Sequence, residues 1–262
     1  MGRKYFNELK PLNKEEANIF AAIKQDRIEN RFIPPALIKL EIGIGLVPLA
    51  DKDLLSYRIR DIRGTIENEI GIRIPSINII INPHLNPFEY ALFINGKELK
   101  QLIKYEIKPG KYLCLNPNGD DFKLEGETDK DPTFGLPCIY ISKEQIDEAL
   151  SALYTVVDSA TILIVSIQEF IKRNISEIFT HSYSKNILES VSRFHPLLLE
   201  DCYAQFDLDE IKNILNKIIK KAGTLSNIDE ILELLLLYSK DTKDCDKIVE
   251  LVLNDSRIKN GG

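Results

Sequence analysis

The stretch that most constrains this chain is residues 128–141, TDKDPTFGLPCIYI, because two prolines and a glycine restrict its backbone. Each proline holds its own φ near about −65° and pushes the preceding residue toward an extended conformation. Gly135 can adopt a φ that larger residues avoid. The stretch begins as a polar turn and ends as an apolar strand, so we predict a stiff loop that presents Phe134 with the carboxylate of Asp131 close by. The alternative, which the residues leave open, is a phenylalanine that fills the core beneath a turn.

The balance of charge argues against a nucleic-acid partner. The net charge is −6 and the isoelectric point is near 5.3, whereas phosphate contacts need clustered Lys and Arg. No basic patch interleaved with aromatic residues occurs, and Trp is absent. With 44% hydrophobic residues in 262, the chain can bury the core of one or two domains, or of several small subdomains.

The cysteines and histidines predict neither a disulfide nor a metal site. Cys114, Cys138, Cys202 and Cys245 lie far apart, and the three histidines share no metal-ligand spacing with them. We expect reduced, structural thiols in a cytosolic protein without cofactors. No apolar run approaches the ~18 residues that span a bilayer, and no signal-peptide pattern is present. Any link to a membrane is therefore expected through a partner or through residues outside this chain.

The first half of the chain has the pattern of an α+β unit with a mostly antiparallel sheet. A helix from the cap Asp53 to Gly71 carries apolar residues at helical spacing, and Asn95-Gly96 is a strong hairpin signal. The expected elements are a linker or arm over 1–36 with a short helix near 15–28, a strand from residue 37 into a glycine turn, the helix, strands over 72–81 and a hairpin over 88–107.

A second small α/β unit is expected over residues 110–158. Short strands are predicted at 112–115 and 122–124 around a polar loop, and Ser142 with Gln145 forms a capping box. The helix after this box would bury Ile146, Ala149, Leu150 and Leu153. The β-branched run 155–157 ends at the possible N-cap Asp158-Ser159, after which a long helix is expected as far as residue 178.

The remainder reads as helical. Helices are predicted over 187–194, from Pro196, over 211–219 with a stop at Gly223, from the cap Asn227, and over 248–252. The run 234–237 is apolar on every side, which predicts a central position in a helical bundle.

Several segments together resemble the cytoplasmic part of the FlhA/LcrD/InvA family, the export-gate proteins of flagellar and virulence type III secretion systems. The resemblance spans residues 37–258 and preserves order and spacing. The matching segments are LEIGIGLVPLAD at 40–51, RIRDIR at 58–63 leading to EIGI at 69–72, PFEY at 87–90, KDPTFGLP at 130–137 and YTVVD at 154–158.

The resemblance implies a fold of small subdomains in a multi-subdomain α+β protein. The expected divisions are an arm over 1–36, a first subdomain over 37–109 plus 159–178, an inserted second over 110–158, and a helical, ring-forming third over 179–258. The family's N-terminal membrane domain and fourth, C-terminal subdomain are expected to be missing from this chain.

The resemblance also implies a non-enzymatic function on the cytoplasmic side of the bacterial inner membrane. The family forms nonameric rings, works with other export-apparatus proteins and docks chaperone–substrate complexes at a shallow hydrophobic dimple. The family's docking residues correspond here to Asp131, Phe134 and Val165, of which Val165 replaces a threonine. The chain further departs from the family in having Ser159 for a proline and VSI at 165–167 for Thr-His-Leu.

Two other functions are weighed against cargo docking. An enzyme could use carboxylates such as Asp120 and Asp121, but these lie in a polar turn, and no phosphate-binding loop, nucleophile elbow or Cys–His pairing occurs. A stand-alone structural or regulatory relative could form or cap the ring without binding cargo. Val165 and the expected loss of the fourth subdomain, which forms the far wall of the family's docking cleft, favour this third function over an enzyme.

Overall fold

The computed structural model describes residues 38–50, 54–95, 99–119 and 121–259. The chain divides into two compact units, Met1–Ile62 with Ser76–Phe170 (the sheet unit) and Arg63–Pro75 with Ile171–Gly262 (the helical unit). The helix expected near 15–28, the cap at Asp53 and the turn residue Gly96 lie outside the described residues, as does Asp120. The finer division into three subdomains stays a prediction.

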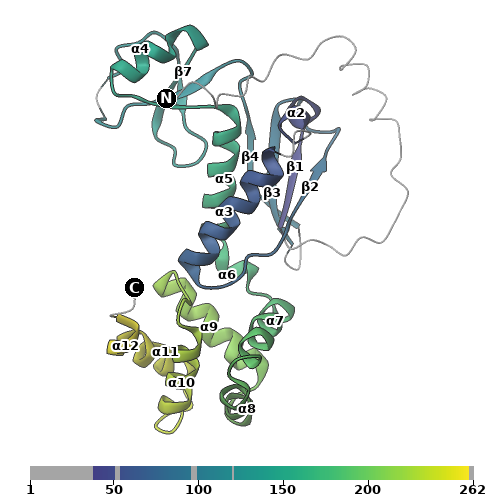
Figure 1. The fold of residues 1–262 in the computed structure, drawn as a ribbon, viewed down its shortest axis with the longest axis vertical. Helices are drawn as coiled ribbons and strands as arrows, with labels where there is room; N and C mark the ends of the chain where they lie inside the picture. Colours follow the sequence, from purple (N-terminus) through teal and green to yellow (C-terminus); the bar gives the residue numbers. More distant parts are fainter. Residues whose placement is uncertain (1–37, 51–53, 96–98, 120, 260–262) are drawn as a thin grey trace. The chain divides into compact units, whose positions relative to one another are not determined.

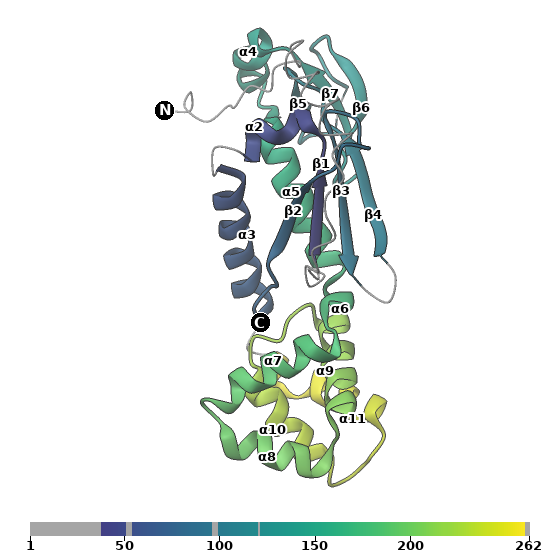
Figure 2. The ribbon, with the colours of Figure 1, turned by 90° about the vertical axis from the view of Figure 1, so that its right-hand side faces the viewer.

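The first sheet of the sheet unit has the order β2-β1-β3-β4 (Figure 2). β1 pairs with β2 in parallel, and the other neighbours are antiparallel, with Leu40 opposite Ile79 on one side and Leu92 on the other. The mostly antiparallel sheet and the hairpin are thereby confirmed. The strands are β1 (Ile38–Ile42), β2 (Ile77–Ile81), β3 (Glu89–Asn95) and β4 (Leu99–Glu106).

The glycine turn after β1 packs directly on the chain before β3. The backbone N–H of Gly43 donates to the Glu89 carbonyl at 2.8 Å, and that of Gly45 to the Pro87 carbonyl at 2.7 Å. A Cβ on Gly43 would lie 2.1 Å from the carbonyl oxygen of Asn86, so no larger residue fits. The short helices η1 (Ile44–Leu46) and α2 (Val47–Ala50) follow.

Two helices, α3 (Leu54–Ile70) and α5 (Ser159–Arg173), contribute residues 54–62 and 159–170 to the sheet unit, and these segments lie against one face of the first sheet (Figure 1). The predicted cap of α5 is confirmed, because the Asp158 carboxylate accepts a 2.7 Å hydrogen bond from the backbone N–H of Thr161. Arg58 of α3 donates to the Thr161 hydroxyl at 3.3 Å. This contact ties α3 to the beginning of α5.

The second sheet has the order β6-β7-β5-β8 and is antiparallel throughout. The strand predicted at 122–124 is wrong: the side chains of Phe122 and Leu124 pack on the core, but the edge strand forms at 127–130, within the expected polar turn. Every side chain of that strand is exposed, so no buried apolar face marks it. The strands are β5 (Tyr112–Leu115), β6 (Glu127–Lys130), β7 (Pro137–Ile141) and β8 (Thr155–Val157).

The capping box of Ser142 and Gln145 is confirmed and opens η2 (Lys143–Gln145), which continues as α4 (Ile146–Ser151). Ile146 and Ala149 are buried as expected. The burial predicted for Leu150 and Leu153 is wrong, because they are 48% and 78% exposed. α4 ends before Leu153, which has a positive φ of 62°, and the chain then turns Tyr154 into the core instead.

The helical unit begins with the end of α3. Gly71 stops this helix as predicted, with a φ of 82°. The strand predicted at Ile74 is wrong. The backbone N–H of Ile74 donates to the Glu67 side chain at 2.8 Å, and its carbonyl accepts from the Arg63 side chain, both on α3. Those bonds use the groups that a strand would need for its ladder.

The remaining helices of this unit confirm most of the sequence-based boundaries. Pro196 stands in the first turn of its helix, and Gly223 ends another with a φ of 77°. The expected helix to residue 178 is interrupted at Asn174, and Leu237 is 46% exposed although Leu234 and Leu235 are buried. The helices are α6 (Ile175–Ile178), α7 (His181–Ser192), α8 (Pro196–Gln205), α9 (Leu208–Ala222), α10 (Ile228–Tyr238), α11 (Cys245–Asn254) and α12 (Ser256–Lys259).

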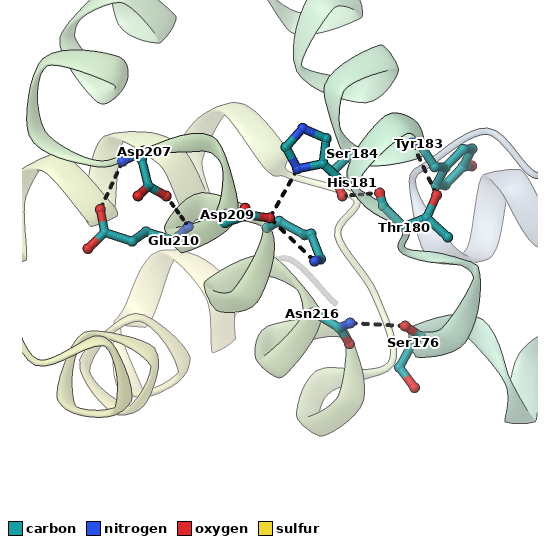
Figure 3. Close-up of polar contacts among 10 residues, drawn as sticks. Ser176, Thr180, His181, Tyr183, Ser184, Asp207, Asp209, Glu210 and Asn216 are labelled. Carbon is teal, nitrogen blue, oxygen red and sulfur yellow. Dashed lines mark hydrogen bonds and ion pairs between the residues drawn. The ribbon is translucent and has the colours of Figure 1, made fainter. Parts of the chain in front are cut away.

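Polar contacts join α6 and α7 to α9 (Figure 3). His181 Nδ1 lies 3.0 Å from Asp209 Oδ1, and the Asn216 side chain donates to the carbonyl of Ser176 at 2.9 Å. At the start of α9, Asp207 and Glu210 form a reciprocal capping box. The capping box satisfies backbone N–H groups that the start of a helix leaves without partners.

Candidate functional site

The loop between β6 and β7 is built around the carboxylate of Asp131. Its Oδ1 accepts hydrogen bonds from the backbone N–H groups of Thr133 and Phe134, both at 2.9 Å, and its Oδ2 accepts from Leu136 at 2.7 Å. The Asp131 backbone also pairs with Leu136, and the N–H of Gly135 donates to the Asp131 carbonyl. One residue therefore closes the loop through both its side chain and its backbone.

Asp131 is buried, although the family resemblance implies a docking role for it. The residue is only 6% exposed and lies beneath the loop. Three N–H donors on one carboxylate satisfy it without a cationic partner. Asp131 therefore shapes the loop, and the atoms available to a partner belong to its neighbours.

Phe134 and Leu136 point outward from this loop. Each is 51% exposed, although large apolar side chains are usually buried. The alternative in which Phe134 fills the core is excluded by that exposure. Gly135 between them has a φ of 71°, the conformation anticipated from its place between the two prolines.

Val165 is half-buried on α5, and its neighbour Ser166 connects that helix to the loop. Ser166 Oγ lies 3.0 Å from Thr133 Oγ1 and accepts a 2.8 Å hydrogen bond from the phenol of Tyr90 on β3. Burial raises the pKa of the Tyr90 phenol, so it stays a neutral donor. The structure thus brings the loop and α5 together through a serine that sequence reasoning did not assign to the site, although a serine amid apolar residues at 162–167 was a visible signal.

The helical unit contains a separate cavity of about 830 Å³, lined by residues 71–75, α7 and the start of α10. Ser190, His195 and Asp229 all line it, a combination that suggests a hydrolase. However, the Ser190 hydroxyl donates to the Asn186 carbonyl at 3.0 Å, and His195 lies 3.9 Å from Asp229, too far for a hydrogen bond. The three side chains do not form a nucleophile–base arrangement.

Other titratable groups also serve the fold. Burial raises the pKa of the Cys114, Cys138 and Cys202 thiols to about 11, and all four cysteines are free thiols. Within the described ranges, no three His, Cys, Asp or Glu side chains are grouped to hold a metal ion. Among the described helices, none is both long and apolar enough to cross a bilayer.

Comparisons with known proteins identify the family. The FHIPEP family model matches residues 5–257. The flagellar biosynthesis protein FlhA of Borreliella burgdorferi is 32% identical over 242 residues, which is 91% of this chain and 34% of that protein.

Two solved structures share the fold. The CdsV protein of Chlamydia pneumoniae superposes with a TM-score of 0.72 at 20% identity, over 87% of this chain and 66% of that one. The nonameric SctV-C of EPEC, determined by cryo-EM, superposes with a TM-score of 0.64 at 16% identity, over 85% of this chain and 66% of its own.

The chain spans about a third of the length of the curated relatives it matches. The family model, in contrast, covers nearly the whole of this chain. The α+β architecture and the mostly antiparallel sheets agree with the solved relatives. This chain therefore belongs to the FHIPEP family, whose curated members include the flagellar biosynthesis protein FlhA.

Proposed function

We propose that this chain is a docking and ring-forming domain of a flagellar or virulence type III export gate, and that it receives chaperone–substrate complexes for export. The observation that carries the proposal is the pair of half-exposed side chains, Phe134 and Leu136, on a loop that Asp131 holds from beneath. An aromatic residue on a rigid support is the typical anchor of a protein–protein interface.

The geometry suits a preformed docking surface. A partner that covers Phe134 and Leu136 removes apolar surface from water, and the fixed loop loses little conformational freedom on binding. Asp131 acts by shaping this surface, and Val165 supplies a further apolar side chain on α5. The site needs no cofactor, metal or catalytic group, and the chain's acidic charge disfavours nucleic acid.

The assembly we propose is a homo-oligomeric ring, formed largely by residues 179–258, on the cytoplasmic side of the bacterial inner membrane. SctV-C, which shares the fold, is nonameric, and this likeness supports a ring. Attachment to the membrane and contact with other export-apparatus proteins would involve residues or partners outside this chain. Light scattering at rising protein concentration tests the ring, and a chain that stays monomeric at every concentration and on membranes carrying the gate contradicts it.

The second candidate is a structural or regulatory relative that forms or caps the ring without receiving cargo. The observation in its favour is Val165, whose side chain has no hydrogen-bonding group at the position where the family resemblance implies a threonine. A docking site that has lost this group would keep its apolar area but lose selectivity among partners.

The test is the affinity of the full chain for a purified chaperone–substrate complex of its own export system. Phe134→Ala is expected to weaken binding by about 2 kcal/mol or more, roughly thirtyfold, with little change in stability. Phe194→Ala is the matched control, because Phe194 is 81% exposed but belongs to the helical unit. If wild type binds and Phe134→Ala binds equally well, the docking site is wrong. If wild type does not bind at all but forms rings in light scattering, the result favours the second candidate over cargo docking.

A further inference from the structure

Three buried hydroxyl groups connect three separate elements of the sheet unit. Tyr90 on β3 donates to Ser166 on α5 at 2.8 Å, and Ser166 lies 3.0 Å from the hydroxyl of Thr133 in the loop. Tyr90 and Ser166 are fully buried, and Thr133 is 8% exposed. The chain of hydroxyls therefore fastens the loop to a helix and, through that helix, to the central region of the first sheet.

Ser166 is the middle member of this chain. Within the described residues it is the hydrogen-bond partner that the structure gives to both the Tyr90 phenol and the Thr133 hydroxyl. Because Tyr90 donates to it, Ser166 can still donate its own proton to Thr133. Removing the Ser166 hydroxyl would leave both neighbours buried without a partner, which is the costly arrangement for a polar group.

The two fastenings of the loop are complementary. Asp131 fixes the backbone from Thr133 to Leu136 and sets the internal shape of the loop, but its hydrogen bonds to described residues stay within 131–136. The hydroxyl of Thr133 reaches outside the loop, to α5. The bonds of Asp131 fix the shape of the loop but not its orientation on the sheet unit. The bond between Thr133 and Ser166 fixes the position of the loop on α5.

We propose that Ser166 is the positioning residue of the Phe134 loop. It holds the loop against α5, so that Phe134 keeps one position relative to a docking partner. This inference rests on the proposed function, because a fixed position of the loop on α5 matters for binding only if Phe134 is a docking anchor. It assigns to Ser166 a role through Thr133 and not through contact with the partner, since the Ser166 side chain is fully buried.

The experiment measures backbone hydrogen exchange in the full chain carrying Ser166→Ala. The amides of Thr133, Phe134 and Leu136 are expected to exchange about ten- to one-hundredfold faster than in wild type, while those of β1 stay unchanged. Ser184→Ala is the matched control, since Ser184 is also a fully buried helical serine, but its hydroxyl donates to the Thr180 carbonyl within the helical unit. This control should leave exchange in the loop at the wild-type rate.

A double-mutant cycle separates positioning from general destabilisation. Thr133→Val removes the loop's hydroxyl at nearly constant volume, so Ser166→Ala in that background should accelerate loop exchange by much less than it does alone. Full additivity would contradict the proposed bond. Ser166→Thr keeps the hydroxyl and, if it folds, should restore slow exchange.

Binding of the purified chaperone–substrate complex completes the test. Faster loop exchange together with weaker binding supports the inference. Wild-type exchange in Ser166→Ala overturns it, whatever the binding result. Faster exchange with unchanged binding overturns the role of the loop's position in docking. Intact binding by Phe134→Ala would separately overturn the proposed function.

Discussion

Replacing Asp131 by alanine should destabilise the protein far more than replacing the exposed Phe134 beside it. The lost carboxylate accepts three backbone hydrogen bonds, from Thr133, Phe134 and Leu136, at 2.7–2.9 Å. Hydrogen bonds to a charged group contribute about 1.5–3 kcal/mol each, which sets an upper limit of several kcal/mol. Two of the three donors belong to half-exposed residues and can reach water if the loop opens. We therefore expect Asp131→Ala to cost about 2–4 kcal/mol.

The comparison with two further variants makes this prediction specific. Asp131→Asn keeps one acceptor oxygen but turns an NH₂ group toward a backbone donor, so its cost should be somewhat below that of alanine. Phe134→Ala removes a side chain that is 51% exposed and should cost about 1 kcal/mol or less. The expected order of stability is thus wild type, Phe134→Ala, Asp131→Asn and Asp131→Ala.

Urea unfolding followed by far-UV circular dichroism measures these differences, since the chain has no tryptophan for a fluorescence assay. Amide exchange in the loop shows whether the loss is local or global. If Asp131→Ala unfolds within about 0.5 kcal/mol of wild type and keeps its loop amides protected, the carboxylate does not organise the loop, and the reasoning fails.

Three further changes test other parts of the fold. Gly71→Ala should lower the free energy of unfolding in urea by about 3 kcal/mol or more, because the new Cβ would lie 2.1 Å from a backbone atom and the residue has a φ of 82°. Gly223→Ala has a similar φ of 77° but open space around the new Cβ, so it should lower the free energy of unfolding by only about 1 kcal/mol. Leu153→Gly should stabilise by about 0.5 kcal/mol, since relief of the positive φ exceeds the added chain entropy, and a lower midpoint would contradict this. Burial raises the pKa of the Tyr90 and Tyr140 phenols. Their stabilisation is complete below the unfolded value of about 10, and above it the free energy of unfolding should fall by about 1.4 kcal/mol per pH unit for each phenol; Tyr90→Phe should lessen this slope.

Elements with local signals were predictable from the sequence. Gly71 and Gly223 end helices because a left-handed residue is needed there, and Pro196 begins one because its missing N–H costs nothing in a first turn. The hairpin of β3 and β4 and the capping box at Ser142 follow from equally local rules. Each of these boundaries depends on a few neighbouring residues, which is why sequence reasoning found them.

Elements decided by distant contacts were missed. β6 has only exposed side chains and exists because its backbone pairs with β7, so no apolar alternation marks it. Phe122 and Leu124 have the composition of a strand, but their neighbour Lys123 donates its N–H to the phenol of Tyr154. The apolar spacing of Leu150 and Leu153 suggested a longer α4, which the turn at Leu153 ends.

The candidate site shows the same division between local and distant causes. The stiff loop could be inferred, since prolines and glycine act on their own neighbourhood, whereas the outward direction of Phe134 was one of two alternatives that the residues left open. The burial of Asp131 could not be inferred, because the three N–H groups that satisfy it converge only in the folded loop. Ser166 stands out in the sequence as a serine among apolar residues, but its hydrogen-bond partners could not be inferred because they lie 33 and 76 residues away.

The polar groups beneath the loop explain how an exposed apolar pair can be kept in one conformation. Phe134 and Leu136 are half-exposed, so burial of their side chains stabilises the loop less than it would in a core. Hydrogen bonds made in a buried environment can hold the loop, because breaking one leaves its partners without water. The loop is therefore held by Asp131 and by the hydroxyl of Thr133, and its two large apolar side chains stay half-exposed. The conformational entropy of such a loop is lost when the protein folds, not when a partner binds. A partner that covers the loop therefore loses less free energy to ordering, and more of the free energy of its apolar contacts appears as affinity.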